Sequence, residues 1–147
     1  MKHPESELQQ ECVKWFRYAY PRYANLLFAI PNGGKRSKIE AAIMKGEGVR
    51  AGVADLFLML PRGVYHGLFI EMKAGKGVQT DMQKEFEADA IKHGYAYEVC
   101  RDIDQFMYVI KCYIRTAENS ICKHSTSCAI GYKCLRNKFQ CEEFENI

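Results

Sequence analysis

Short apolar segments alternate with amphipathic helical patterns along this chain, and that alternation restricts the fold more than any other feature. The segments at 26–30, 54–60, 65–73 and 95–100 are bounded by proline, glycine or polar residues, which is typical of strands. Apolar residues recur at helical spacing over 5–19, 37–45, 80–93 and 102–116. The resulting order, α-β-α-β-β-α-β-α, predicts an α/β fold in which helices flank both faces of a mixed central sheet of about four strands.

Local signals indicate where the predicted helices begin. Ser37 and Glu40 form a capping-box pattern, so a helix is expected to start there. Thr80 or Asp81 would cap the next helix, and Asp102 would cap the last one. In the helix that follows Ser37, the residues expected to face inward are Ile39, Ala42 and Ile43.

The periodic pattern ends near residue 117, which divides the chain into a predicted domain at 1–116 and a cysteine-rich tail at 117–147. Four of the seven cysteines lie in this tail, near His124, at Cys122, Cys128, Cys134 and Cys141. Paired zinc ligands usually lie about two to four residues apart, and the spacing here is wider. We therefore expect a loosely ordered tail with reduced thiols, in preference to a structural Zn²⁺ site.

Composition and charge argue against a membrane-spanning chain and leave the choice of partner open. No run of 18 apolar residues is present, and the polar start MKHPESELQQE lacks the apolar stretch of a signal peptide. We therefore expect a cytoplasmic protein. The formal charge of +3 permits nucleic-acid binding without arguing for it.

Two carboxylates and a lysine are expected on one face of a hairpin that turns at residues 61–63. Asp55 lies eight residues before Gly63 and Glu71 lies eight after it. A regular antiparallel pair would therefore place these two carboxylates opposite each other. Lys73 follows Glu71 by two residues in the same strand, so its side chain points to the same face.

Charged groups on otherwise apolar strands are costly unless they are paired or bound to metal. The two carboxylates would repel each other, and Mg²⁺ or Mn²⁺, which binds carboxylates, water and phosphate, would relieve that repulsion. Lys73 would then hold or activate the attacking water, or offset negative charge on the phosphate. A plain salt bridge between Lys73 and either carboxylate accounts for the same three residues, and they alone leave it open.

A glycine-rich loop and a short basic segment precede the hairpin. Glycines allow close approach of the backbone to a ligand, and basic side chains can meet phosphate. The expected nucleic-acid track consists of Asn32, Gly33, Gly34, Lys35, Arg36, Lys38 and Arg50. A turn followed by the solvated, basic start of a helix explains the same segment.

Several segments together resemble the virus-type replication-repair nuclease family, VRR-NUC, of the PD-(D/E)xK superfamily, over roughly residues 4–110. They are PESELQ at 4–9, IPNGGKR at 30–36, GVRAGVADLFL at 48–58, FIEMKAGKG at 69–77, and Gln83 with the helix after it. The family usually has Gly-x-Pro-Asp where this chain has Gly52-Val53-Ala54-Asp55. The aspartate is kept, so the departure affects local geometry more than chemistry.

The resemblance implies a restriction-endonuclease-like core and a Mg²⁺- or Mn²⁺-dependent nuclease that hydrolyses phosphodiester bonds in DNA. It implies that Asp55 and Glu71 bind the metal, with the Met72 backbone carbonyl as a third ligand. Lys73 would position and activate the nucleophilic water. The family name also suggests viral replication or repair, in which case a phage-encoded protein would work in the host cytoplasm.

Two further residues acquire roles only through this resemblance. Gln83 would orient the water, the metal or the hairpin, although a solvent-facing helix residue is the alternative. Glu5 would bind or order a metal from the first predicted helix. Glu7 and Glu11 are its rivals for that role, and an acidic residue favoured by the helix dipole is the simpler explanation of Glu5.

The resemblance leaves substrate and assembly to be decided. Stand-alone members of the family are similar to Holliday-junction resolvases, which implies a homodimer and a preference for branched or flapped DNA. A non-cleaving nucleic-acid-binding module is the main alternative, and the presence of Asp55, Glu71 and Lys73 favours the enzyme. An RNA-processing nuclease would need an acid–base histidine, and we interpret His66 as a surface residue of the hairpin.

Overall fold

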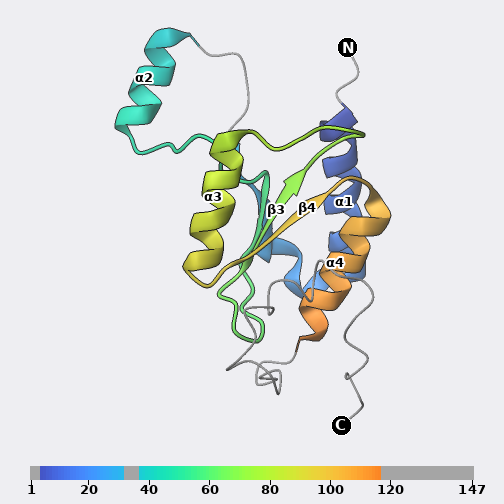
Figure 1. Ribbon diagram of the computed structural model, residues 1–147. Helices are drawn as coiled ribbons and strands as arrows, with labels where there is room; N and C mark the ends of the chain where they lie inside the picture. Colours follow the sequence, from blue (N-terminus) through green and yellow to red (C-terminus); the bar gives the residue numbers. More distant parts are fainter. Residues whose placement is uncertain (1–3, 32–36, 117–147) are drawn as a thin grey trace.

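The computed structural model describes residues 4–31 and 37–116, and these residues form a helix-flanked sheet (Figure 1). The four strands, in spatial order, are β1 (Leu27–Ala29), β2 (Leu56–Leu58), β3 (Leu68–Met72) and β4 (Ala96–Cys100). The pairs β1–β2 and β2–β3 are antiparallel, and β3–β4 is parallel. The predicted mixed sheet of about four strands is therefore confirmed.

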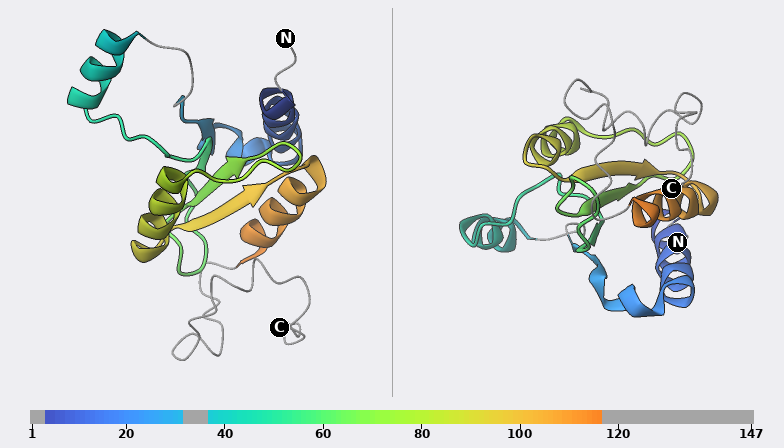
Figure 2. Two further views of the ribbon diagram at one scale, coloured as in Figure 1. Left: turned by 45° about the horizontal axis from the view of Figure 1, so that its top comes forward. Right: turned by 90° about the horizontal axis from the view of Figure 1, so that it is seen from below.

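The helices follow the predicted order. They are α1 (Pro4–Ala19), α2 (Lys38–Gly46), α3 (Asp81–Lys92) and α4 (Ile103–Arg115). α1 and α4 cover one face of the sheet and α3 covers the other (Figures 1 and 2). A short 3-10 helix, η1 (Pro21–Leu26), was not predicted, because proline ends an α-helix yet is compatible with the first turn of a new one. In the described ranges, no helix is long and apolar enough to cross a membrane.

The larger hydrophobic core lies between the sheet and the pair α1 and α4. Phe16 of α1 and Phe106 of α4 are fully buried there, against strand residues such as Leu56 and Ile70. Successive residues of a strand point to opposite faces, so the neighbours of these core residues face α3. A smaller cluster around Phe86 occupies that second face. The side chains of Asp55 and Glu71 consequently lie on the α3 side of the sheet.

The expected packing of α2 is wrong. Ser37 and Glu40 do form the predicted capping box, so the helix starts as expected. However, Ala42 is exposed, and Ile39 and Ile43 are 74% and 55% exposed. The helix projects away from the sheet (Figures 1 and 2). Helical spacing of apolar residues predicts a stripe on one side of a helix, but it does not reveal whether another element covers that stripe.

Gly52 fixes how closely the chain approaches α3 before it enters β2. Its φ is +81°, and a Cβ at this position would lie 2.5 Å from the backbone carbonyl carbon and oxygen of Met82. We expect Gly52→Ala to cost roughly 2 kcal/mol or more, from the left-handed backbone and the overlap together. Thermal unfolding would measure it. Gly46→Ala, where a Cβ meets no atom within 4 Å, is the matched control; equal melting temperatures of the two variants would contradict this account.

Candidate active site

The hairpin of β2 and β3 sets Asp55 opposite Glu71. The observed register pairs Leu56 with Ile70 and Leu58 with Leu68, and its continuation by one residue pairs the two carboxylates. This is the pairing predicted from equal spacing around Gly63. The Asp55 carboxylate accepts a hydrogen bond from the Met72 backbone N–H at 2.8 Å. Asp55 is thus held across the strand pair, beside Glu71.

Glu71 is the most deeply buried group of this cluster, at 1% exposure. One carboxylate oxygen, Oε1, lies 3.0 Å from Nζ of Lys73 and accepts a hydrogen bond from Nε2 of Gln83. The other oxygen, Oε2, is buried and has no hydrogen-bond partner among the residues that the structure describes. A buried carboxylate oxygen without a partner is energetically costly, so within the described residues Oε2 still needs one positive or hydrogen-bonding group.

The electrostatics of the cluster point to the same deficit. Burial, and then the charge of Asp55, raise the pKa of Glu71 to about 7, although Lys73 opposes the shift. Burial also raises the pKa of Asp55, against the hydrogen bond from the Met72 N–H. The charge of Glu5 adds to both shifts. Among the described residues, the carboxylates of Asp55, Glu71 and Glu5 outnumber the nearby ammonium of Lys73, and a cation would be stabilised among them.

Gln83 belongs to this cluster through both ends of its amide. Thr80 caps α3 in a capping box, in which the Gln83 side-chain oxygen accepts from the Thr80 N–H at 2.9 Å. The amide nitrogen of Gln83 is then free to donate to Glu71. Thr80 is thus the cap that the sequence left undecided between two residues. The Gln83 side chain faces the hairpin, not the solvent.

Glu5 is the carboxylate of α1 that reaches the hairpin. Its Oε1 accepts a hydrogen bond from the Ala74 N–H at 3.3 Å, in the connection that follows β3. Glu7 and Glu11 lie further along α1 and are exposed. The structure therefore brings Asp55, Glu71, Lys73, Gln83 and Glu5 together from α1, the hairpin and α3.

A family model described as the VRR-NUC domain matches residues 1–102. The chain belongs to the VRR-NUC family. A solved structure described as a "VRR_NUC domain protein" is 31% identical in sequence, has a TM-score of 0.68, and aligns over 81% of this chain and 94% of that one. A comparison with curated proteins gives no match. The chain is thus a member of a nuclease family, and its nuclease-like α/β fold agrees with the resemblance.

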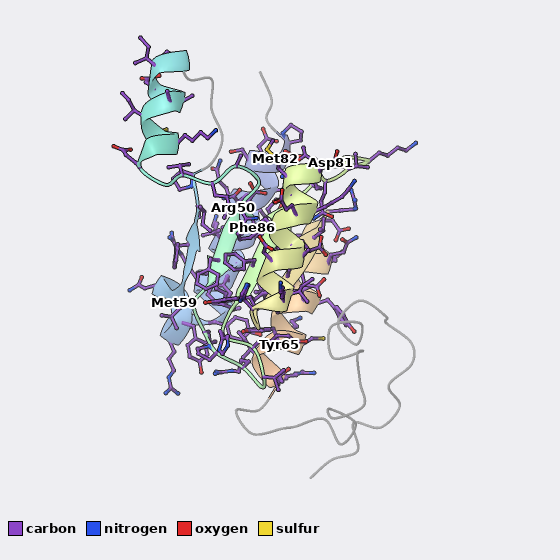
Figure 3. All side chains as sticks on the ribbon, turned by 60° about the vertical axis from the view of Figure 1, so that its left-hand side comes forward. Arg50, Met59, Tyr65, Asp81, Met82 and Phe86 are labelled. Carbon is purple, nitrogen blue, oxygen red and sulfur yellow. The ribbon has the colours of Figure 1, made fainter. Side chains whose placement is uncertain are left out.

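The basic residues expected to contact nucleic acid are only partly placed in this VRR-NUC domain. Arg50 forms an ion pair of 2.6 Å with Asp89 of α3, and its guanidinium lies 5.2 Å from the centre of the Phe86 ring (Figure 3). Arg50 is therefore engaged on α3. Lys38 is the first residue of α2, and its side chain is not described. The remaining residues of the expected track, Asn32, Gly33, Gly34, Lys35 and Arg36, lie outside the described residues, as does the tail at 117–147 with its cysteines.

The donor set of the site fits a hard divalent cation. Over 4–31 and 37–116, no three His, Cys, Asp or Glu side chains form a ready-made metal cluster. Mg²⁺ does not require one, because it commonly binds one or two carboxylates and completes its shell with water and substrate phosphate. Asp55 and Glu71 supply two carboxylates, and the unpartnered Oε2 of Glu71 is where a cation would remove the cost of burial.

One contact beside the site was missed by the sequence analysis. Arg101, directly after β4, donates hydrogen bonds through Nη1 to the carbonyl oxygens of Gly75 and Gly77, at 3.1 and 2.6 Å. A single arginine after a strand belongs to no motif. Only the parallel pairing of β3 with β4, which brings the ends of these strands together, shows where it lies.

Proposed function

We propose that this VRR-NUC protein is a Mg²⁺- or Mn²⁺-dependent deoxyribonuclease that hydrolyses phosphodiester bonds at the cluster of Asp55, Glu71 and Lys73. The observation that supports it best is the buried carboxylate of Glu71, which has one oxygen against Lys73 and the other without a partner in the described residues. The salt bridge to Lys73 engages only one oxygen, so it does not remove the cost of burying the other. Membership of a nuclease family supports the same reaction class.

Each residue of the cluster has a part in this proposal. Asp55 and Glu71 would hold the divalent ion, with the Met72 backbone carbonyl as a third ligand. A bound divalent ion supplies Lewis acidity, which polarises the phosphate and eases deprotonation of water. The Lys73 ammonium would hold the attacking water and stabilise negative charge that develops on the phosphate. Gln83 keeps the Glu71 carboxylate oriented through its fixed amide.

Glu5 would act on metal affinity, because its negative charge reaches Asp55 and Glu71 from α1. We expect Glu5→Gln to raise the Mg²⁺ concentration for half-maximal cleavage by about tenfold, the usual lower range for groups that support metal ligands. Glu7→Gln, on the same turn of α1, is the matched control and should leave the metal titration unchanged. Identical titration curves for the two variants would remove Glu5 from the site.

Substrate structure and assembly complete the proposal. The family resemblance favours branched or flapped DNA and a homodimer, and the exposed isoleucines of α2 give a second copy an apolar surface to cover.

The test incubates the protein with duplex, single-stranded, flapped and four-way-junction DNA, in Mg²⁺, Mn²⁺ or EDTA, after its mass in solution is measured by light scattering. Cleavage that requires metal supports the nuclease. Salt-dependent binding without cleavage would instead support a non-cleaving nucleic-acid-binding module.

A further inference from the structure

The connection from β3 to α3 is anchored by a cation from the neighbouring strand. Both hydrogen bonds of the Arg101 guanidinium go to carbonyl oxygens that flank Lys76, those of Gly75 and Gly77. The backbone N–H of Arg101 also donates to the side chain of Gln105 in α4, at 3.1 Å. Arg101 is therefore held in place. Lys76 is exposed and belongs to the segment that Arg101 holds.

This anchored segment adjoins the carboxylate cluster. A Cβ on Gly77 would lie 3.5 Å from Cδ of Lys73 and 3.6 Å from Oε1 of Glu5. The Ala74 N–H of the same segment donates to Glu5. Figure 1 shows the connection at the top of the molecule, where it passes the N-terminal end of α1. Lys76 thus belongs to, and Arg101 holds, the segment that borders Lys73 and Glu5.

The geometry leaves the arginine able to bind an anion. Its two contacts within the described residues both use Nη1, so the N–H groups on Nη2 and Nε remain as donors, and the residue is exposed. A guanidinium presents these donors in a planar array that matches two oxygens of a phosphate. Because the carbonyl groups already restrict the side chain, less conformational entropy is lost when a ligand binds.

We propose that Arg101 and Lys76 form a phosphate-binding subsite for the nucleic-acid backbone, next to the phosphodiester that is cut. The inference rests on the proposed function, and it is independent of the basic segment at 32–38. The ligand is a phosphate within a polynucleotide, recognised by charge and by the planar donors, without base specificity. If Arg101 only balanced the charge of the acidic cluster, its substitution would change the affinity for metal and leave the affinity for DNA unchanged.

The test compares the salt dependence of DNA binding in Arg101→Gln, Lys76→Gln and Arg115→Gln. Glutamine removes the charge of Arg101 and keeps an amide that can donate to the carbonyl groups. Lys76→Gln leaves those hydrogen bonds untouched, so it tests the same subsite if the first variant is unstable. Arg115, in the last turn of α4, is exposed and serves as the matched charge control. Binding of a labelled DNA duplex is followed by fluorescence anisotropy in EDTA, so that cleavage does not interfere.

Each of the first two variants should reduce the slope of log K against log salt by about 0.9 and weaken binding about fivefold near physiological salt. Arg115→Gln should match the wild type. Slopes of Arg101→Gln and Lys76→Gln equal to that of Arg115→Gln would overturn the subsite, even if the wild type cuts DNA normally. Absence of metal-dependent cleavage by the wild type would reject the nuclease separately, because the slopes are measured without metal.

Discussion

Lys73→Ala is expected to lower metal-dependent DNA cleavage by about a hundredfold or more, the usual effect of losing a group that transfers protons or stabilises charge in the transition state. The Lys73 ammonium lies 3.0 Å from Glu71, and its side chain is 12% exposed. Bulk water in the variant would therefore compensate poorly for the lost charge. Metal affinity should be kept or increased, because the variant leaves the carboxylates without their cation. Single-turnover cleavage at saturating Mn²⁺ and a separate Mn²⁺-binding titration distinguish the two effects.

Lys84→Ala is the matched control for this variant. Lys84 lies on α3 and pairs with Asp81 at 3.2 Å in an exposed position, where its loss should change neither cleavage nor metal binding. A Lys73→Ala protein that cleaves DNA at the wild-type rate would show that the pair of Lys73 and Glu71 is only a salt bridge. That is the alternative which the sequence left open.

The metal-free protein is expected to lose stability as the pH rises from about 5 to about 7.5. The pKa of Glu71 is about 7 in the folded chain, against 4.5 for an ordinary glutamate. The native state therefore retains this proton at pH values where the unfolded chain has released it. Between the two pKa values, the free energy of unfolding falls as pH increases, and the loss levels off once the pH exceeds the folded-state pKa of about 7.

Thermal unfolding in EDTA and in Mg²⁺ across this pH range would measure the effect. Glu71→Gln cannot titrate, so its melting temperature in EDTA should fall less steeply with pH than that of the wild type. Added Mg²⁺ should stabilise the wild type more at pH 7.5 than at pH 5.5, because the proton must leave before the carboxylate binds a metal. Parallel pH profiles for wild type and variant in EDTA would mean that Glu71 is not the group responsible.

The hairpin could be predicted closely because its geometry is local. Side chains alternate along a strand, and equal spacing around Gly63 matches the register of β2 and β3, which places Asp55 opposite Glu71. The turn itself pairs Arg62 with Tyr65, one residue out of that register, so the turn alone would not have given this pairing. For a similar, local reason, the residue that caps α3 could be predicted to be either Thr80 or Asp81. A capping box involves residues three apart, and Gln83 satisfies Thr80.

The contacts that cross the fold could not be predicted in this way. Glu5, Glu7 and Glu11 lie on one helix, and helical spacing does not say which of them meets the connection after β3 at Ala74. Arg101 reaches Gly75 and Gly77 only because β4 runs parallel to β3. Where α2 would lie was equally undetermined, since an apolar stripe on a helix does not identify its neighbour.

The two antiparallel strands β1 and β2 are, in effect, a hairpin whose turn has been replaced by α2. Ala29 pairs with Leu56, and the Ile30 N–H donates to the Asp55 carbonyl at 2.8 Å, so the insertion leaves and rejoins the sheet at adjacent points. Lengthening such an insertion adds little loop-closure entropy to the cost of folding. Its length and surface can therefore diverge between related proteins while the carboxylate of Asp55, at its base, stays in place.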